Sequence, residues 1–243
     1  MTDSVHKPIG DEGFCFSCHD GRDCFGTCCR KVELLLYPVD IIRLKKRLSI
    51  HSEEFLHRYC FPAPSQNAFF PSLFLRMTDT EEKTCPFLAG ASCSVYTDRP
   101  ASCRMYPLER AVSRVRPPGS SREEKYFLVE HGYCHGHRNA PRLTIDQWLR
   151  TQELHPYNLE NELWTDMDTF FSTNPWKGEG AYGPKQQLAF MVCYNIDRFR
   201  AYANDHNLIQ QASCHKTHRR RIGSDDMALL HFGYDWLKKV LSR

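Results

Sequence analysis

The sequence lacks any long hydrophobic run. None of its 243 residues belong to a segment near the roughly 18 consecutive apolar residues that a membrane-spanning helix needs. The opening segment, MTDSVHKPIGDEGF, also lacks the apolar centre of a secretory signal peptide. We therefore expect a cytoplasmic protein with no membrane partner.

An excess of charge of one sign is absent as well. The 32 Lys and Arg residues nearly balance the 29 Asp and Glu residues, which leaves a formal net charge of +3. The short basic run at residues 219–221 has no aromatic residues beside it. Because nucleic-acid binding normally needs a strong basic surface, these features argue against nucleic acid as a partner.

Motifs that would assign a reaction are missing too. The chain has no Gly-rich strand–turn–helix fingerprint for a nucleotide, no internal repeat and no spaced pair of carboxylates that suggests acid–base catalysis. The sequence therefore leaves open whether the protein is an enzyme and what its substrate or protein partner is. It also leaves open which residues would be catalytic or would bind an organic cofactor.

Cysteine is what the sequence has in excess. Twelve cysteines make up about 5% of the chain, and ten of them lie before residue 135. Structural disulfides rarely persist in a reducing cytosol, where clustered cysteines more often bind metal or act as catalytic thiols. The distribution predicts a cysteine-rich N-terminal part followed by a different C-terminal part.

Eight of the cysteines form the candidate metal site. Four are crowded into CHDGRDCFGTCC, three lie in CPFLAGASCSVYTDRPASC, and one follows in YCHGH. Thiolates are soft, charged ligands that suit zinc and iron–sulfur clusters, and eight would complete two four-ligand shells. The predicted metal ligands are Cys18, Cys24, Cys28, Cys29, Cys85, Cys93, Cys103 and Cys134.

The adjacent pair Cys28 and Cys29 has a special place in this prediction. Neighbouring side chains usually diverge, so one ion would be chelated by both only with strain. We expect them to bind two different metals, or different irons of one cluster. Paired Cys-x2-Cys knuckles are absent from the eight, which weakens an ordinary zinc-finger interpretation.

Other residues near the clusters have open roles. Cys15, His135 and His137 could coordinate metal, and His19 resembles them in lying beside a cysteine. Arg99 and Arg104 could screen thiolate charge. Cys60 and Cys193 lie in apolar surroundings and are expected to pack in the core. Cys214, in a polar segment with two histidines, is expected in a loop.

Three segments, in order, carry a resemblance to a known family. They are CHDGRDCFGTCCR, CPFLAGASCSVYTDRPASCRMYPL and YCHGH, within residues 14–138. Together they resemble the YkgJ-like CxxCxxCC cysteine-cluster family, a zinc- or iron-chelating domain. The first spacing differs, with five and three residues between cysteines where the family pattern has two and two. The resemblance implies binding of zinc or an iron–sulfur cluster, with the identity undecided.

Two enzymatic alternatives accompany this interpretation. One is an iron–sulfur oxidoreductase or electron-transfer protein. The other is a cluster-dependent modifying enzyme, because flagellin lysine N-methylase has a similar cysteine-rich region. Neither alternative has a recognisable catalytic residue in this sequence.

Local patterns predict an α+β fold that is mostly helical. Strands are expected at 69–77 and 125–130. Three helices are expected to begin near Pro38, at an N-cap Ser52 and at an N-cap Thr144. Further helices are expected to cover 159–171, 185–203 and 225–243. We expect residues 14–138 to form an irregular cysteine-rich core that binds the metal or cluster. Residues 139–243 would form a helical region packed on it, in one compact unit.

Overall fold

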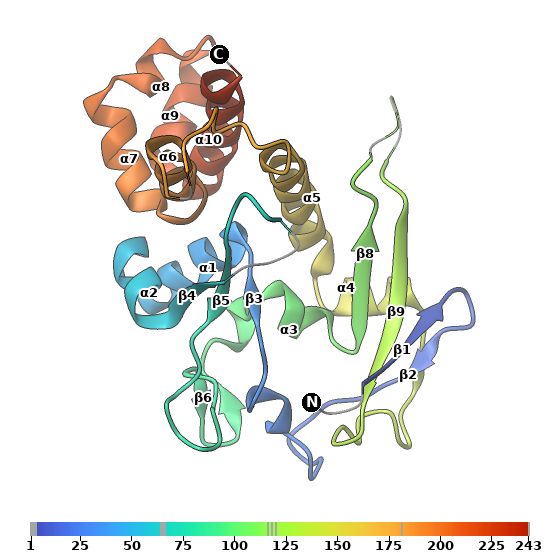
Figure 1. Ribbon diagram of the computed structural model, residues 1–243. Helices are drawn as coiled ribbons and strands as arrows, with labels where there is room; N and C mark the ends of the chain where they lie inside the picture. The colour runs from blue at the N-terminus through green and yellow to red at the C-terminus, as the bar shows by residue number, and fades with distance from the viewer. Residues whose placement is uncertain are drawn as a thin grey trace. The chain divides into compact units, whose positions relative to one another are not determined.

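The computed structural model describes residues 4–63, 67–115, 117, 119, 121–180 and 182–242. Its internal contacts divide the chain into two units (Figure 1). We call Met1–Leu35 with Leu75–Glu162 the cysteine unit, and Leu36–Phe74 with Leu163–Arg243 the helical unit. All eight predicted metal ligands belong to the cysteine unit.

The fold class is α+β and mostly helical, as predicted. The described residues form ten α-helices, two short 3-10 helices and several small sheets. Within this described part of the chain, no helix has both the length and the apolar character needed to cross a membrane.

Short strands dominate the cysteine unit. β1 (Ser4–Ile9), β9 (Glu124–His131) and β8 (Leu108–Val112) form an antiparallel sheet with β9 in the centre. β2 (Phe14–Cys15) pairs with β10 (Arg142–Leu143), and β6 (Leu88–Ala89) pairs with β7 (Ser92–Cys93). The strand expected at 125–130 is therefore confirmed as part of β9.

A compact aromatic core supports these strands. Phe14 and Phe16 pack edge-to-face against Trp148, whose indole N–H donates to the carbonyl of Met105 at 2.9 Å. Trp148 lies on α4 (Ile145–Thr151), which is capped as predicted by Thr144: its hydroxyl accepts from the Gln147 backbone N–H. A reciprocal bond from Gln147 completes a capping box.

Six short elements and one long helix, α5, complete the part of the fold before α6. They are η1 (Thr27–Cys29), β3 (Leu35–Leu36), β4 (Cys60–Ala63), β5 (Ser72–Leu75), η2 (Tyr96–Asp98), α3 (Ala101–Met105) and α5 (Leu154–Phe171). β3, β5 and β4 form a three-stranded sheet in that order, so the strand expected at 69–77 is present as β5.

The second predicted helix starts differently from expectation. α1 (Pro38–Leu48) does begin at Pro38, but α2 (Ser52–Tyr59) has His51 rather than Ser52 at its N-cap. The Ser52 hydroxyl is fully buried and donates to the Asn195 side-chain oxygen at 2.8 Å. The buried Ser52 hydroxyl therefore forms a hydrogen bond with Asn195 and does not cap α2, because a buried polar group needs a hydrogen-bond partner.

Helices build most of the helical unit. Besides α1 and α2, they include α6 (Pro184–Tyr194), α7 (Ile196–Asp205), α8 (Leu208–Gln211), α9 (Lys216–Ser224) and α10 (Asp226–Leu241). The single helix expected over 185–203 is interrupted at Asn195, which leaves the helical conformation with φ −112° and ψ 70°. Its side chain accepts the Arg198 backbone N–H and so caps α7.

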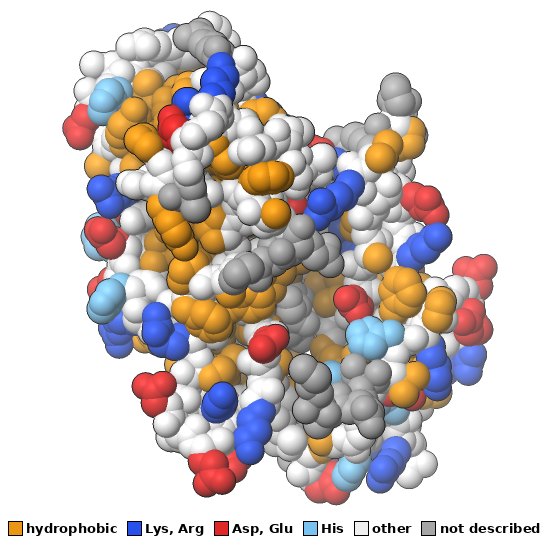
Figure 2. All heavy atoms as spheres, in the orientation of Figure 1, with side chains coloured by type: hydrophobic (Ala, Val, Ile, Leu, Met, Phe, Trp, Pro, Cys, Tyr) orange, Lys and Arg blue, Asp and Glu red, His pale blue; other side chains and the backbone are white. Residues whose placement is uncertain are grey.

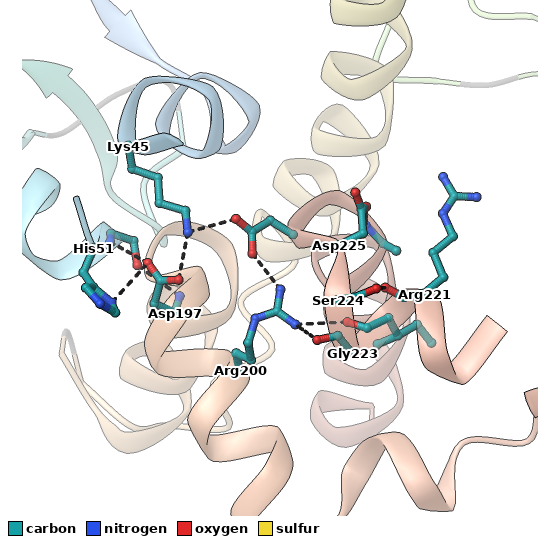
Figure 3. A network of polar contacts seen from close by, with 12 residues as sticks. Lys45, His51, Asp197, Arg200, Arg221, Gly223, Ser224 and Asp225 are labelled. Carbon is teal, nitrogen blue, oxygen red and sulfur yellow. Dashed lines mark hydrogen bonds and ion pairs between the residues drawn. The ribbon is translucent and has the colours of Figure 1, made fainter. Parts of the chain in front are cut away.

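A polar network connects several of these helices (Figure 3). The Lys45 ammonium of α1 lies 2.8 Å from carboxylate oxygens of both Asp197 and Asp226. Arg200 pairs with Asp226 at 2.6 Å, and the Ser52 backbone N–H donates to Asp197 at 2.7 Å. Because the Lys45 side chain is only 10% exposed, both carboxylates are needed to balance its desolvation.

Candidate metal centre

The first cysteine cluster lies in a chain of tight turns. Backbone N–H groups at residues 22, 25, 27 and 29 each donate to the carbonyl three residues earlier. Gly26 has a φ of +80°, a conformation that L side chains rarely adopt, and leads into the 3-10 helix Thr27–Cys29. This winding gathers four cysteines into one compact loop without a regular strand or long helix.

The second cluster is attached directly to the first. The Cys85 backbone N–H donates to the carbonyl of Cys29 at 2.8 Å, beside an antiparallel bridge between Arg30 and Thr84. The β6–β7 hairpin that follows sets Cys93 opposite Leu88. Two segments that lie more than 50 residues apart in the chain therefore meet at the cysteines.

The third segment closes on the same loop. After β9 the chain turns at Cys134, whose N–H donates to the His131 carbonyl at 2.9 Å. The His135 backbone N–H then donates to the Cys24 sulfur at 3.2 Å. The Ser17 N–H donates to the Gly136 carbonyl at 2.9 Å, which fixes the two segments against each other.

The electrostatics of the thiols show which sulfurs lie close together. Desolvation raises the pKa of Cys18 to about 11, and the neighbouring thiols of Cys28, Cys134 and Cys24 act in the same direction. Arg22 opposes them. These four thiols come from the first cluster and from the turn after β9, so one group of sulfurs spans both segments.

Cys28 connects this group with the second cluster. Burial raises the pKa of Cys85 to about 11, and the nearby Cys93 and Cys28 thiols raise it further. Burial also raises the pKa of Cys93, where Cys28 contributes and Arg99 opposes. Cys28 thus lies near sulfurs of the first and second segments, and Cys18 lies near both Cys28 and the Cys134 sulfur of the third.

The side chains of the adjacent Cys28 and Cys29 were expected to diverge, but their thiols face each other. A hydrogen bond with the Cys29 thiol is the main cause that raises the pKa of Cys28, followed by desolvation. Both residues belong to η1. Their two thiols lie side by side, and the binding of different metals or different irons by the pair stays a prediction.

Cys103 is related to the other thiols through Arg99. It is exposed on α3 and lies near Arg99, the guanidinium that also faces Cys93. Arg99 therefore has the position expected of a residue that screens thiolate charge. Arg104 does not: its buried guanidinium donates to the carbonyls of Thr97 and Gln152.

Aromatic rings line the thiols on one side. Tyr133, His131 and Tyr106 form a continuous stack, with ring centroids 5.0 and 5.7 Å apart. Burial raises the pKa of Tyr133 to about 12, with the Cys28, Cys134 and Cys29 thiols adding to it. Burial and the nearby Cys134 thiol raise the pKa of Tyr106. Both phenols therefore stay protonated at neutral pH and can donate to a sulfur.

The other cysteines lie apart from these contacts. Cys60 and Cys193 are 3% and 2% exposed, as expected of core residues. Cys15 on β2 lies between the buried Phe14 and Phe16, whose rings face the aromatic core. Among the described residues no cysteine forms a disulfide.

Sequence reasoning missed Asp23. Its carboxylate lies 2.7 Å from Nδ1 of His135, and ligand atoms of Asp23, Cys24 and His135 lie within 4.8 Å of one another. His135 was singled out by its place beside Cys134, but nothing local marks an aspartate that is 112 residues away from its partner.

The donor set fits a metal. Soft sulfurs from three segments converge, and desolvation is the main cause that raises the pKa values of Cys18 and Cys85. A bound cation would favour the thiolate forms, so thiol protons would be released on binding.

Comparison with protein families agrees with this geometry. Residues 17–135 match the CxxCxxCC family model, which is described as "Putative zinc- or iron-chelating domain". This stretch of the chain belongs to the CxxCxxCC family. The matched range begins just before Cys18 and ends just after Cys134, so it contains all eight predicted ligands. Searches of curated proteins and of solved structures gave no match.

Proposed function

We propose that this CxxCxxCC protein binds zinc or an iron–sulfur cluster through eight cysteine thiolates. The ligands would be Cys18, Cys24, Cys28, Cys29, Cys85, Cys93, Cys103 and Cys134. The observation that supports this most strongly is the hydrogen bonding that joins the three cysteine segments: the Cys85 N–H donates to the Cys29 carbonyl at 2.8 Å, and the His135 N–H donates to the Cys24 sulfur at 3.2 Å. Metal ions are the partners that this arrangement suits.

The metal would have a structural role in the cysteine unit. The loop at residues 17–31 is built from turns, and turns alone bury little apolar surface. Binding free energy at such a site contributes directly to folding, because the ligands are brought together only in the folded chain. Four protein ligands at a centre leave no vacancy for substrate, as is usual for structural zinc.

An enzymatic role is the weaker candidate. A cluster-dependent oxidoreductase or lysine N-methylase-like enzyme would need catalytic residues beside the cysteines, and the sequence has no recognisable motif that supplies them. We therefore argue for metal binding and assign no catalytic residue.

The expected setting of this function is the cytoplasm, where reduced thiols remain available to metal. Nucleic acid is a poor candidate for a partner. On the face drawn in Figure 2, Lys and Arg side chains alternate with Asp and Glu side chains instead of forming one basic surface.

Metal analysis of anaerobically purified protein tests the proposal. Zinc without sulfide would identify zinc sites, whereas iron with acid-labile sulfide and visible absorption would identify a cluster. Cys28→Ser should lower the metal content strongly, because it removes a sulfur that lies near thiols of both cysteine clusters. Cys214→Ser, in the helical unit, is the matched control and should keep the full content. A wild-type chain that holds no metal, even after titration with zinc, would refute the proposal.

A further inference from the structure

Asp23, Cys24 and His135 form a distinct group at one edge of the cysteine cluster. Atoms that could bind a metal, one from each residue, lie within 4.8 Å of one another. Asp23 and Cys24 are adjacent in the turn-rich loop, and His135 arrives from the turn after β9. Two independent chain segments therefore supply the three side chains.

Two hydrogen bonds hold this group in place. The His135 backbone N–H donates to the Cys24 sulfur at 3.2 Å. The His135 ring nitrogen Nδ1 lies 2.7 Å from Asp23 Oδ1. The imidazole and the carboxylate thus already face each other beside the sulfur, and little rearrangement is needed to surround an ion.

The chemistry of these ligands differs from that of the remaining thiols. Iron–sulfur clusters are held mainly by thiolates, whereas a set of sulfur, nitrogen and oxygen suits a single zinc-like divalent ion. A carboxylate and a thiolate also supply two negative charges, which match a divalent cation. Cys24 therefore has partners that the all-thiolate arrangement does not use.

Solvent reaches this group. The Asp23 side chain is 75% exposed and that of His135 is 31% exposed. Three protein ligands at a solvent-facing edge leave a fourth position for water or an exchanging ligand, as in open zinc sites. A cation there could exchange with the solvent.

We propose that Asp23, Cys24 and His135 bind one divalent cation of the zinc type, in a mixed site with an open position. This inference rests on the proposed function, because Cys24 is one of the eight predicted thiolates. It reassigns Cys24 to a mononuclear centre and adds Asp23 and His135 as ligands. The other thiols would serve the remaining metal.

Cobalt substitution of the full chain tests the assignment, since Co²⁺ reports its ligands in its visible ligand-field bands and its near-ultraviolet sulfur charge-transfer bands. The test variants are His135→Gln and Asp23→Asn. The matched controls are His155→Gln, an exposed histidine on α5, and Asp20→Asn, an exposed aspartate in the same loop. Competition with a chelator measures the affinity of each protein for zinc.

Both test variants should lose part of the cobalt ligand-field spectrum. They should also bind the cation of the mixed site at least about 10-fold more weakly than the wild-type protein does, which is the lower end of the loss caused by removing a metal-site partner. Both controls should match the wild-type protein. His135→Cys guards against misfolding: it should retain the cation and gain sulfur charge-transfer intensity, which a purely structural role of His135 would not produce.

The outcomes separate the two proposals. A wild-type chain that binds metal, with spectra and affinities unchanged in His135→Gln and Asp23→Asn, would overturn the mixed site and leave the thiolate proposal intact. A His135→Cys chain without added sulfur absorption would also overturn it. A wild-type chain that binds no cobalt or zinc would overturn both.

Discussion

At the scale of single residues, Gly136 is critical for closing the cysteine cluster. Its carbonyl accepts the Ser17 N–H, and the position where a Cβ would lie is 2.5 Å from an atom of the Phe16 ring. Phe16 is 3% exposed and packs in the aromatic core, so it has little room to move. Only glycine lets the segment that carries Cys134 and His135 approach this closely.

We predict that Gly136→Ala destabilises the metal-loaded protein by about 1–3 kcal/mol, because the added methyl group overpacks a filled core. Gly132→Ala is the matched control, since no atom lies within 4 Å of the added Cβ. Urea unfolding of both variants measures the difference. Equal unfolding midpoints for the two would show that the close approach to Phe16 is not required.

At the scale of elements, the Lys45 network links α1, α7 and α10 through charge. Desolvation acts to raise the pKa of Asp197, but hydrogen bonds from Lys45 and the Ser52 backbone outweigh it and lower that pKa. Desolvation of Asp226 is likewise outweighed by Lys45 and Arg200, so the pKa of this carboxyl is lowered too. Both carboxylates are therefore more stable ionised in the folded state than in the unfolded chain.

We predict that the helical unit loses stability as the pH falls. A carboxyl with a depressed pKa contributes stability above its unfolded value of about 3.9, and this contribution disappears as the pH falls through the folded-state pKa. Thermal unfolding between neutral and strongly acidic pH, followed by the near-ultraviolet signal, measures the loss.

Asp197→Asn should make this acid-dependent loss smaller. Asp146→Asn removes an exposed carboxylate that pairs with Arg150 on α4, and it should keep the wild-type pH profile. A profile that stays unchanged in Asp197→Asn would contradict the assignment of acid sensitivity to the Lys45 network.

At the scale of the whole molecule, the two units differ in what stabilises them. The helical unit buries large side chains such as Leu229, Phe199 and Leu237 completely within its helices. The cysteine unit has an aromatic core around Trp148, but its residues 17–31 are held by turns and by the sulfur contacts. Metal binding should therefore matter most in that loop.

We predict that a strong chelator, under reducing conditions, loosens residues 14–138 and leaves α10 protected. The binding energy of structural metal is folding energy, so its removal should increase amide exchange in the segments that carry the cysteines. Hydrogen–deuterium exchange with peptide resolution measures this effect. Unchanged exchange around Cys28 after verified metal loss would refute a structural role.

The local features of the protein were predictable from the sequence. The capping box at Thr144, the start of α1 at Pro38 and the burial of Cys60 and Cys193 follow from short-range patterns. The family could be recognised for the same reason, because its cysteines and their Pro, Asp and Tyr neighbours lie in compact segments. Capping and hydrophobic periodicity act over a few residues, so one sequence suffices to detect them.

The tertiary structure decided what depends on distant partners. Ser52 was expected to cap a helix, but its hydroxyl forms a hydrogen bond with Asn195 instead. Asn195 in turn interrupts the helix expected over 185–203. Asp23 gained significance only from His135, because a metal-binding group is defined by distance in space. The sequence by itself determined that cysteines would gather in the first half of the chain and that the fold would be α+β. Which sulfurs face one another was decided by backbone hydrogen bonds between separate segments, which no local pattern encodes.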